Sequence, residues 1–271
     1  MEPKGRGGRN QHHVFEIAGL PCRVASDDQA FWSELDHYGP FQSQAAPVFS
    51  VEAVIKDPPA PLETRQSDGP YAHLDLCGER LFIAGPGFEG SFDFSAGRGT
   101  IVQPCDPSPF ETFLTAILGW YLRRVGGFFL HSAALQCGEK TLVFFGPSGS
   151  GKTTLATVVG EGVLSDEIVA VRREGAGYRV HGLPWRGSAR SGTLSGCFAL
   201  QKASVTEVCP LTEVLAVRRL LPSIFYTTPA AEELGETFRM VSDLVAEVPC
   251  FDLRFTPDRS AWERSLESVV R

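Results

Sequence analysis

The sequence predicts an α+β protein in two parts, a smaller β-rich N-terminal domain followed by a larger domain of mixed strands and helices. Two observations carry this prediction. Residues 14–103 alternate short β-favouring runs with Gly- and Pro-rich turns. Beyond residue 106, a glycine-rich loop lies between a β-favouring run and a helical pattern. A chain of 271 residues with 43% hydrophobic content can form one large domain or two modest ones.

The N-terminal part contains the β-favouring runs. Residues 1–12 are rich in Gly, Arg and polar side chains, and we expect a disordered tail there. A mostly antiparallel domain is expected over residues 13–105, with one helix around 28–36. Its expected strands are 14–18, 48–55, 72–76, 80–84, 91–94 and 100–103. No catalytic constellation precedes residue 106.

The second domain, residues 106–271, is expected to begin with a helix over 107–124 that bridges the two domains, because its apolar side chains recur at helical spacing. Strands 128–135 and 141–145 are expected to form a hairpin that turns near Gly138. The other expected strands are 162–171, 169–173, 178–181, 194–200 and 248–255, and the later helices are 211–221, one that starts after Pro229 and 259–270.

The strongest functional signal is the stretch Gly-Pro-Ser-Gly-Ser-Gly-Lys-Thr-Thr at residues 146–154, which matches the phosphate-binding loop pattern at every constrained position. Its glycines let successive backbone N–H groups point at phosphate oxygens. Lys152 is expected on the β- and γ-phosphates of ATP, and the Thr153 hydroxyl on Mg²⁺. The expected nucleotide-binding residues are Gly146, Ser148, Gly149, Ser150, Gly151, Lys152, Thr153 and Thr154. A flexible turn, the alternative, needs neither the lysine nor the hydroxyl.

His131 is the candidate site residue on the strand before the loop. In a hairpin centred near Gly138, antiparallel pairing places residue 131 across from about residue 145, beside the mouth of the loop. A lone histidine in an apolar strand is more often a core residue, which is the alternative interpretation. The register favours a site residue.

Asp166 and Glu167 are the candidate carboxylates, in the middle of the apolar run 162–171. Burying two charges among apolar side chains is costly unless they meet a cation, and Mg²⁺ on a nucleotide would supply one. An exposed strand end is the alternative. Arg186 and Arg190 follow in an expected loop, where either could meet phosphate or an acidic substrate, although surface arginines are common.

Composition excludes several classes. The net charge of −7 and the absence of a basic stripe argue against nucleic-acid binding. The N-terminus lacks the apolar core of a secretory signal, and the longest apolar run, 113–122, is too short to span a bilayer, so we expect no membrane association and a cytoplasmic location. Seven scattered cysteines without a Cys-x-x-Cys pair indicate neither zinc nor a disulfide framework, and we expect them reduced and mostly in the core.

Five stretches stand in a specific order: Leu-His-Ser-Ala-Ala-Leu at 130–135, the loop at 146–154, Leu-Ser-Asp-Glu at 164–167, Val-His-Gly-Leu-Pro-Trp-Arg-Gly at 180–187 and Val-Pro-Cys-Phe-Asp-Leu-Arg-Phe-Thr-Pro-Asp at 248–258. Together they resemble the HPr serine kinase/phosphorylase superfamily. The closer resemblance is to its divergent HPr-kinase-related members, which include kinases found with lasso-peptide and other modified-peptide biosynthesis clusters. The resemblance covers residues 106–271.

The resemblance implies a phosphoenolpyruvate-carboxykinase-like P-loop kinase core, which differs from the parallel sheet of most phosphate-loop ATPases. It implies that Asp166 takes the proton from the acceptor hydroxyl, that His131 contacts the transferred phosphoryl group and that Lys152 neutralises its charge. Glu167 would support the metal or the base, so that Thr153, Asp166 and Glu167 form the metal set. HPr kinases are hexamers, so a homo-oligomer is also implied.

Two departures from the family pattern are visible. The glycine-rich signature associated with phosphorolysis has no clear counterpart in residues 187–196, which argues against the reverse reaction and against HPr itself as the substrate. The interval from Lys152 to Asp166 is also shorter than expected, which implies a trimmed helix.

Four functions fit these patterns. The leading one is a kinase for a Ser or Thr hydroxyl of a peptide or small protein, with the N-terminal domain helping to hold the substrate. The second is a kinase of a small metabolite. The third is a transport or regulatory ATPase, which is weakly supported because residues 194–197 match only part of the required LSGGQ signature. The fourth is a nucleotide-binding regulatory module without catalysis.

Overall fold

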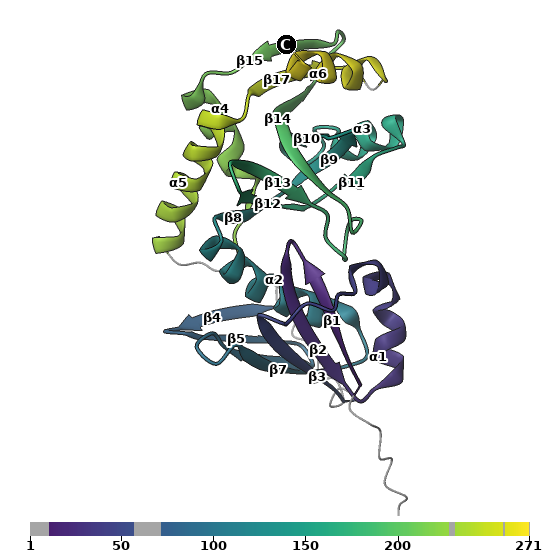
Figure 1. Cartoon of the computed structure of the whole chain (residues 1–271), viewed down its shortest axis with the longest axis vertical. Helices are drawn as coiled ribbons and strands as arrows, with labels where there is room; N and C mark the ends of the chain where they lie inside the picture. Colours follow the sequence, from purple (N-terminus) through teal and green to yellow (C-terminus); the bar gives the residue numbers. More distant parts are fainter. Residues whose placement is uncertain (1–10, 57–71, 228–230, 257, 271) are drawn as a thin grey trace, which may run out of the picture. The chain divides into compact units, whose positions relative to one another are not determined.

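The structure is a computed structural model that describes residues 11–56, 72–227, 231–256 and 258–270 (Figure 1). It is a mixed α+β protein with two mixed sheets, which confirms the predicted class at that level. The chain divides into two compact units, Met1–Leu118 and Gly119–Arg271. Because compactness alone does not define an independently folding domain, the predicted boundary after residue 105 stays a prediction.

Unit 1 contains a sheet whose order, among the described residues, is β1-β2-β3-β7-β6-β5-β4. Its strands are β1 (Gln11–Ile17), β2 (Leu20–Ser26), β3 (Phe49–Ile55), β4 (His73–Cys77), β5 (Arg80–Gly85), β6 (Phe88–Asp93) and β7 (Arg98–Gln103). Only β3 runs parallel to its neighbours β2 and β7, among the pairs described. The prediction missed β2, whose Gly19 and Pro21 resemble a turn in the sequence. A disordered tail was predicted for residues 1–12. Residues 1–10 lie outside the described part of the chain, but Gln11 and His12 belong to β1, so the prediction is wrong for these two residues.

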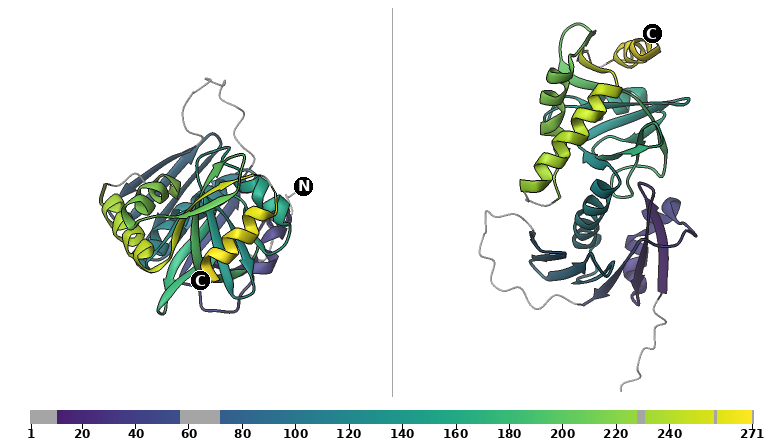
Figure 2. Two further views of the ribbon diagram at one scale, coloured as in Figure 1. Left: turned by 90° about the horizontal axis from the view of Figure 1, so that it is seen from above. Right: turned by 60° about the vertical axis from the view of Figure 1, so that its left-hand side comes forward.

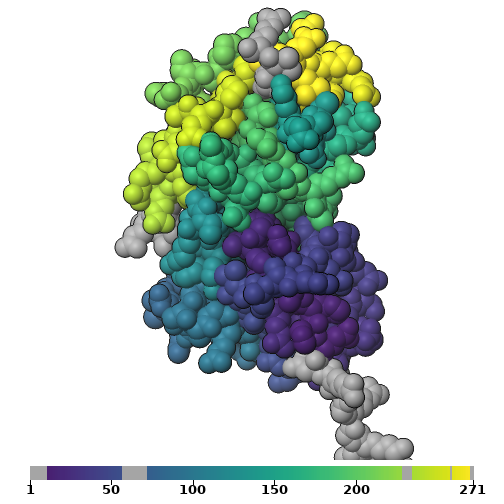
Figure 3. Space-filling model, in the orientation of Figure 1, coloured from purple at the N-terminus to yellow at the C-terminus, as the bar shows by residue number. Residues whose placement is uncertain are grey.

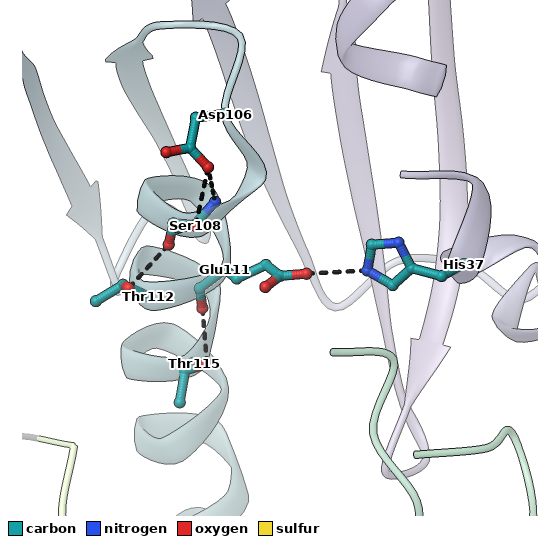
Figure 4. A network of polar contacts seen from close by, with 6 residues as sticks. All are labelled: His37, Asp106, Ser108, Glu111, Thr112 and Thr115. Atoms are coloured by element: carbon teal, nitrogen blue, oxygen red, sulfur yellow. Dashed lines mark hydrogen bonds and ion pairs between the residues drawn. The ribbon is translucent and has the colours of Figure 1, made fainter. Parts of the chain in front are cut away.

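Two helices, α1 (Gln29–Glu34) and α2 (Pro107–Arg124), begin at side-chain caps. The Asp28 carboxylate accepts a hydrogen bond from the Phe31 amide at 2.8 Å, which starts α1, and η1 (Asp36–Phe41) follows. At the start of α2, Asp106 accepts from the amide and hydroxyl of Ser108 (Figure 4). His37 of η1 meets Glu111 of α2 at 3.0 Å, so this contact ties the two elements together (Figure 4).

The long helix α2 spans the division between the units, which falls between Leu118 and Gly119. Its buried apolar side chains and its basic last turn agree with the periodicity in the sequence.

Unit 2 contains a larger mixed sheet, described in the order β11-β9-β10-β14-β13-β12-β8-β16, with β17 beside β14 and β15 beside β17. Its strands are β8 (Gly127–Leu130), β9 (Ser132–Cys137), β10 (Lys140–Phe145), β11 (Val163–Ser165), β12 (Val169–Glu174), β13 (Gly177–His181), β14 (Ser191–Lys202), β15 (Glu207–Pro210), β16 (Ile224–Phe225) and β17 (Cys250–Phe255). Its helical elements are α3 (Lys152–Val159), α4 (Glu213–Leu220), η2 (Leu221–Ser223), α5 (Ala231–Glu247) and α6 (Ser260–Val270). The later strands and helices agree with the predicted elements, except that β15 and β16 were not predicted.

Helices cover both faces of this sheet (Figure 2). One core joins the sheet to α4 and α5 through Leu220, Val241 and Leu244. The other core joins it to α3 and α6 through Leu155 and Trp262. Both faces of the central strands are therefore buried, which explains their nearly continuous apolar sequence.

Two expectations about burial were wrong. Phe238 was expected on the apolar face of α5, but 51% of it is exposed, on a helix whose outer side is open to solvent (Figure 3). All seven cysteines are free, but the expectation that most lie in the core fails, because only Cys22, Cys197 and Cys250 are buried. Within the described residues, no helix combines the length and apolar character needed to cross a bilayer.

Candidate functional site

The β9–β10 hairpin brings His131 to the loop. Phe145 pairs with Ser132, one residue from the predicted partner, so His131 lies where β10 enters Gly146. The predicted strand 128–135 is nevertheless wrong as a single strand. It breaks at His131, whose backbone amide donates to the Ser223 carbonyl at 2.7 Å instead of to a sheet neighbour.

The acidic run 162–171 is also not one strand. It divides into β11 and β12, with residues 166–168 between them. Ser165 pairs with Ala134, whereas Val169 pairs with Leu130. Residues 131–133 and 166–168 therefore face each other across a gap in one antiparallel ribbon. Carboxylates in this gap avoid the cost of lying inside a fully paired, buried strand.

The loop itself has the backbone geometry that its glycines allow. Gly149 and Gly151 have φ of 76° and 107°, values that favour glycine. A Cβ on Gly151 would lie 2.6 Å from the Phe255 ring, so packing excludes a side chain there as well. The loop ends at Gly151, the N-cap of α3, whose first amides are free to bind an anion.

Lys152 lies inside the curve of the loop. Only 7% of the residue is exposed, and Nζ donates to the carbonyls of Gly146 at 2.9 Å and Pro147 at 3.3 Å. Desolvation lowers the pKa of Lys152, and the nearby charge of Glu167 acts in the opposite direction. Beside it, the buried Ser150 hydroxyl has no hydrogen-bond partner among the described residues. The Lys152 ammonium and the Ser150 hydroxyl are hydrogen-bond donors of the kind that a bound polyphosphate would require.

Glu167 links the gap to the loop. Its negative charge acts on both Lys152 and His131, and its carboxylate pairs with the Arg186 guanidinium at 3.1 Å. The Ser165 hydroxyl accepts from the Glu167 amide at 3.2 Å and donates to the Arg186 carbonyl at 2.8 Å. The expected role of Arg186 as a substrate contact stays a prediction, and in the structure Arg186 forms an ion pair with Glu167.

Asp166 is half-buried, and its side chain makes no polar contact within the part of the chain described. Its oxygens are therefore open to a ligand. Arg190, the other candidate arginine, is exposed and contributes only its carbonyl, which accepts from the Gly182 amide at 3.0 Å. The structure thus brings together His131, Lys152 and Glu167, and it leaves the Arg190 side chain without a contact to them.

The loop 182–190 lies against β11. The Ser188 amide donates to the Leu164 carbonyl at 2.8 Å, and Gly187 forms a bridge with Ser165. A Cβ on Gly182 would lie 2.1 Å from the Ser188 carbonyl oxygen, so this close approach requires glycine. Trp185 meets Phe129 edge-on at 6.4 Å between ring centroids. These contacts hold Arg186 beside Glu167.

A cavity of about 810 Å³ adjoins the start of the loop. Its lining joins His131 and residues 146–148 to Arg218 and Arg219 of α4. Arg219 pairs with Asp252 at 3.3 Å, whereas the Arg218 side chain has no ionic partner in the described residues. Neither arginine stands out in the sequence, because a basic last turn is also common on ordinary surface helices.

No group of three or more His, Cys, Asp or Glu side chains with metal-binding geometry occurs in the described part of the chain. Mg²⁺ at a phosphate-loop site takes most of its ligands from nucleotide phosphates and water, with one or two from the protein. Thr153, which is exposed at the first turn of α3, and the carboxylates of the gap are the residues that fit this role.

A comparison with protein-family models found no match, and a comparison with curated proteins found no significant match.

His131 offers a direct test of the electrostatics in the gap. Partial desolvation and then the charge of Lys152 lower its pKa, and Glu167 opposes them. Its NMR titration midpoint should lie below 6.5, rise in Lys152→Ala and fall further in Glu167→Gln, with the resonance assigned through His131→Gln. Because the unfolded chain binds this proton more readily, the contribution of His131 to stability is complete above pH 6.5 and is lost as the pH falls towards the folded pKa. A midpoint unchanged by both variants would contradict this arrangement.

Proposed function

We propose that this chain is an ATP-dependent kinase that transfers the γ-phosphoryl group to a Ser or Thr hydroxyl of a peptide or small protein. The observation that carries the proposal is the gap in the β-ribbon, where the charge of Glu167 acts both on His131 and on the lysine of a complete phosphate loop. A glycine-rich turn without a binding role does not require a lysine, a histidine and a carboxylate beside it.

We further propose that the core of unit 2 is phosphoenolpyruvate-carboxykinase-like. The loop strand β10 is antiparallel to β9 and parallel to β14. This mixed surrounding supports such a core over the parallel sheet of most phosphate-loop ATPases.

The residues divide the chemistry among themselves. The loop amides and Lys152 hold the phosphates of ATP, and Lys152 offsets the charge that spreads over the transferred group. Asp166 accepts the proton of the acceptor hydroxyl as its oxygen bonds to the γ-phosphorus. The bond from that phosphorus to the bridging oxygen breaks, and ADP leaves with the bonding electron pair. His131 donates a hydrogen bond to the transferred group.

The metal set would be Thr153, Asp166 and Glu167. Mg²⁺ supplies charge neutralisation on the phosphates when it is bound. Glu167 is already neutralised in part by Arg186 at 3.1 Å, which suits a supporting carboxylate. Asp166 has no such partner in the described chain, which suits a base that must accept a proton.

The cavity beside the loop supports a large acceptor or a nucleoside. Its apolar lining from Ala199, Leu200, Leu215 and Pro222 suits a purine base or a peptide side chain better than a small polar metabolite. Leu215 is 46% exposed, so a ligand can reach this apolar surface. Transfer only to a free metabolite would overturn the peptide part of the proposal.

The test is phosphoryl transfer from γ-labelled ATP with Mg²⁺ to a mixed library of Ser- and Thr-containing peptides, mapped by mass spectrometry. Lys152→Ala is expected to reduce transfer by about 10²–10³-fold, the usual cost of removing one donor that stabilises transition-state charge. Lys140→Ala on β10 is the matched control and should leave transfer unchanged, because its side chain lies at the far end of that strand from the loop. Label on serine or threonine supports the proposal, and ATP hydrolysis without any labelled acceptor contradicts it.

A further inference from the structure

The open face of the unit 1 sheet carries a row of arginines that the proposed kinase chemistry does not use. The row crosses five strands, since Cα pairing aligns Arg23 of β2 with Ser50 of β3, Ser50 with Arg98 of β7, Arg98 with Asp93 of β6, and Asp93 with Arg80 of β5. Side chains alternate between the faces of a strand, so these five lie on the same face.

The opposite face of the same strands is apolar. Val24, Val51, Leu81 and Phe92 alternate with the row, and each is at most 1% exposed. Burial therefore fixes the register, and with it the direction of the arginines, because a slip of one residue would expose the core. The fold therefore places the three arginines on this face.

The row lines a hollow of about 560 Å³. The hollow is also lined by a parallel row of side chains two residues further along the same strands. This row includes Glu52, Thr100, Ser91 and Phe82, and Phe82 is 44% exposed. The hollow therefore offers hydroxyl groups and one aromatic ring beside the charges, which are features of surfaces that hold a peptide.

The charges in the hollow are not balanced. Hydrogen bonds from the Ser95 hydroxyl and the Ala96 amide, together with the ion pair to Arg80 at 3.2 Å, lower the pKa of Asp93 to about 2. Arg23 and Arg98 have no ion pair within the described residues. Three arginines against Asp93 and Glu52 leave an excess of one positive charge, although the whole chain carries −7.

We propose that this face binds an acidic, extended peptide segment of a partner protein. Arg23 and Arg98 lie two strands apart, and neighbouring strands are about 4.8 Å apart, so their backbones are about 10 Å apart. A polyproline II segment rises about 3.1 Å per residue with three residues per turn, so every third side chain lies on one face at about 9.3 Å. Carboxylates at every third position therefore match the two unpaired guanidinium groups.

The experiment uses the full chain and a fluorescein-labelled peptide of three Glu-Pro-Ala repeats, with three Gln-Pro-Ala repeats as the uncharged control. Fluorescence anisotropy should show binding of the acidic probe only, weakened as salt rises from about 20 to about 300 mM. The double variant Arg23→Glu with Arg98→Glu should weaken binding at least about tenfold. Arg239→Glu on α5, an arginine-to-glutamate control outside unit 1, should not.

Comparing two single arginine variants distinguishes specific binding at this face from nonspecific attraction between arginines and an acidic peptide. Arg80 is already neutralised by Asp93, so Arg80→Ala should weaken binding less than Arg98→Ala. Equal binding by the double variant and the Arg239→Glu control would overturn the proposal. Equal binding of the Gln probe would also overturn it, as would saturation by inorganic polyphosphate without any binding of the acidic probe. The measurement needs neither nucleotide nor transfer, so its result is independent of the kinase proposal.

Discussion

Asp166→Asn should slow phosphoryl transfer by about 10²–10⁴-fold, the usual contribution of a positioned general base. An amide cannot accept the acceptor's proton, but it is nearly the same size as the carboxylate. Asp166 makes no polar contact within the described residues, so the substitution should leave the fold intact. The measurement is single-turnover transfer of labelled phosphate to the acceptor peptide, with ATP affinity measured separately by equilibrium binding.

Glu167→Gln is the matched comparison, because it removes the neighbouring carboxylate and its pair with Arg186 at 3.1 Å. It should mainly raise the Mg²⁺ concentration needed for half-maximal transfer, since Glu167 acts on the charges of the site rather than on the acceptor. If Asp166→Asn keeps full transfer while Glu167→Gln loses it, the base is Glu167 and the assignment of Asp166 is wrong. If ATP hydrolysis without an acceptor survives Asp166→Asn unchanged, the kinase mechanism itself fails.

Phe198→Ala should destabilise unit 2 by about 3–5 kcal/mol, the range for removing a buried aromatic ring. Phe198 is 0% exposed and stacks between Phe144 at 5.2 Å and Phe251 at 4.9 Å, measured between ring centroids. These residues come from three adjacent strands, β10, β14 and β17, so the cavity would open at the centre of the sheet. Urea unfolding followed by tryptophan fluorescence gives the change in free energy of unfolding.

The control for this prediction is Phe238→Ala on α5, where the same ring is 51% exposed. We expect it to change stability by less than about 1 kcal/mol, as is usual for surface substitutions. A loss below about 1 kcal/mol in Phe198→Ala would contradict the described packing. In a unit of this size, about 3–5 kcal/mol corresponds to a fall in Tm of roughly 6–20 °C.

Features that depend on near neighbours along the chain could be predicted from the residues alone. The loop 146–154, the hairpin register near Gly138 and the long helix α2 all follow from short-range spacing and turn chemistry. His131 could be placed beside the loop for the same reason, because a two-residue turn fixes which residues pair across a hairpin. Periodicity could not distinguish a continuous strand from β11 and β12 divided by a gap, since both are apolar.

Which side chains meet across the gap depends on the three-dimensional fold. Glu167 acts on Lys152 and His131 because β11 pairs with β9 while β12 pairs with β8, and Arg186 joins them through a loop that lies on β11. The positions of Arg218 beside the cavity and of the arginine row on the first sheet also depend on the fold. Such contacts join residues far apart in the chain, and they depend on strand order and register, to which local propensity contributes little.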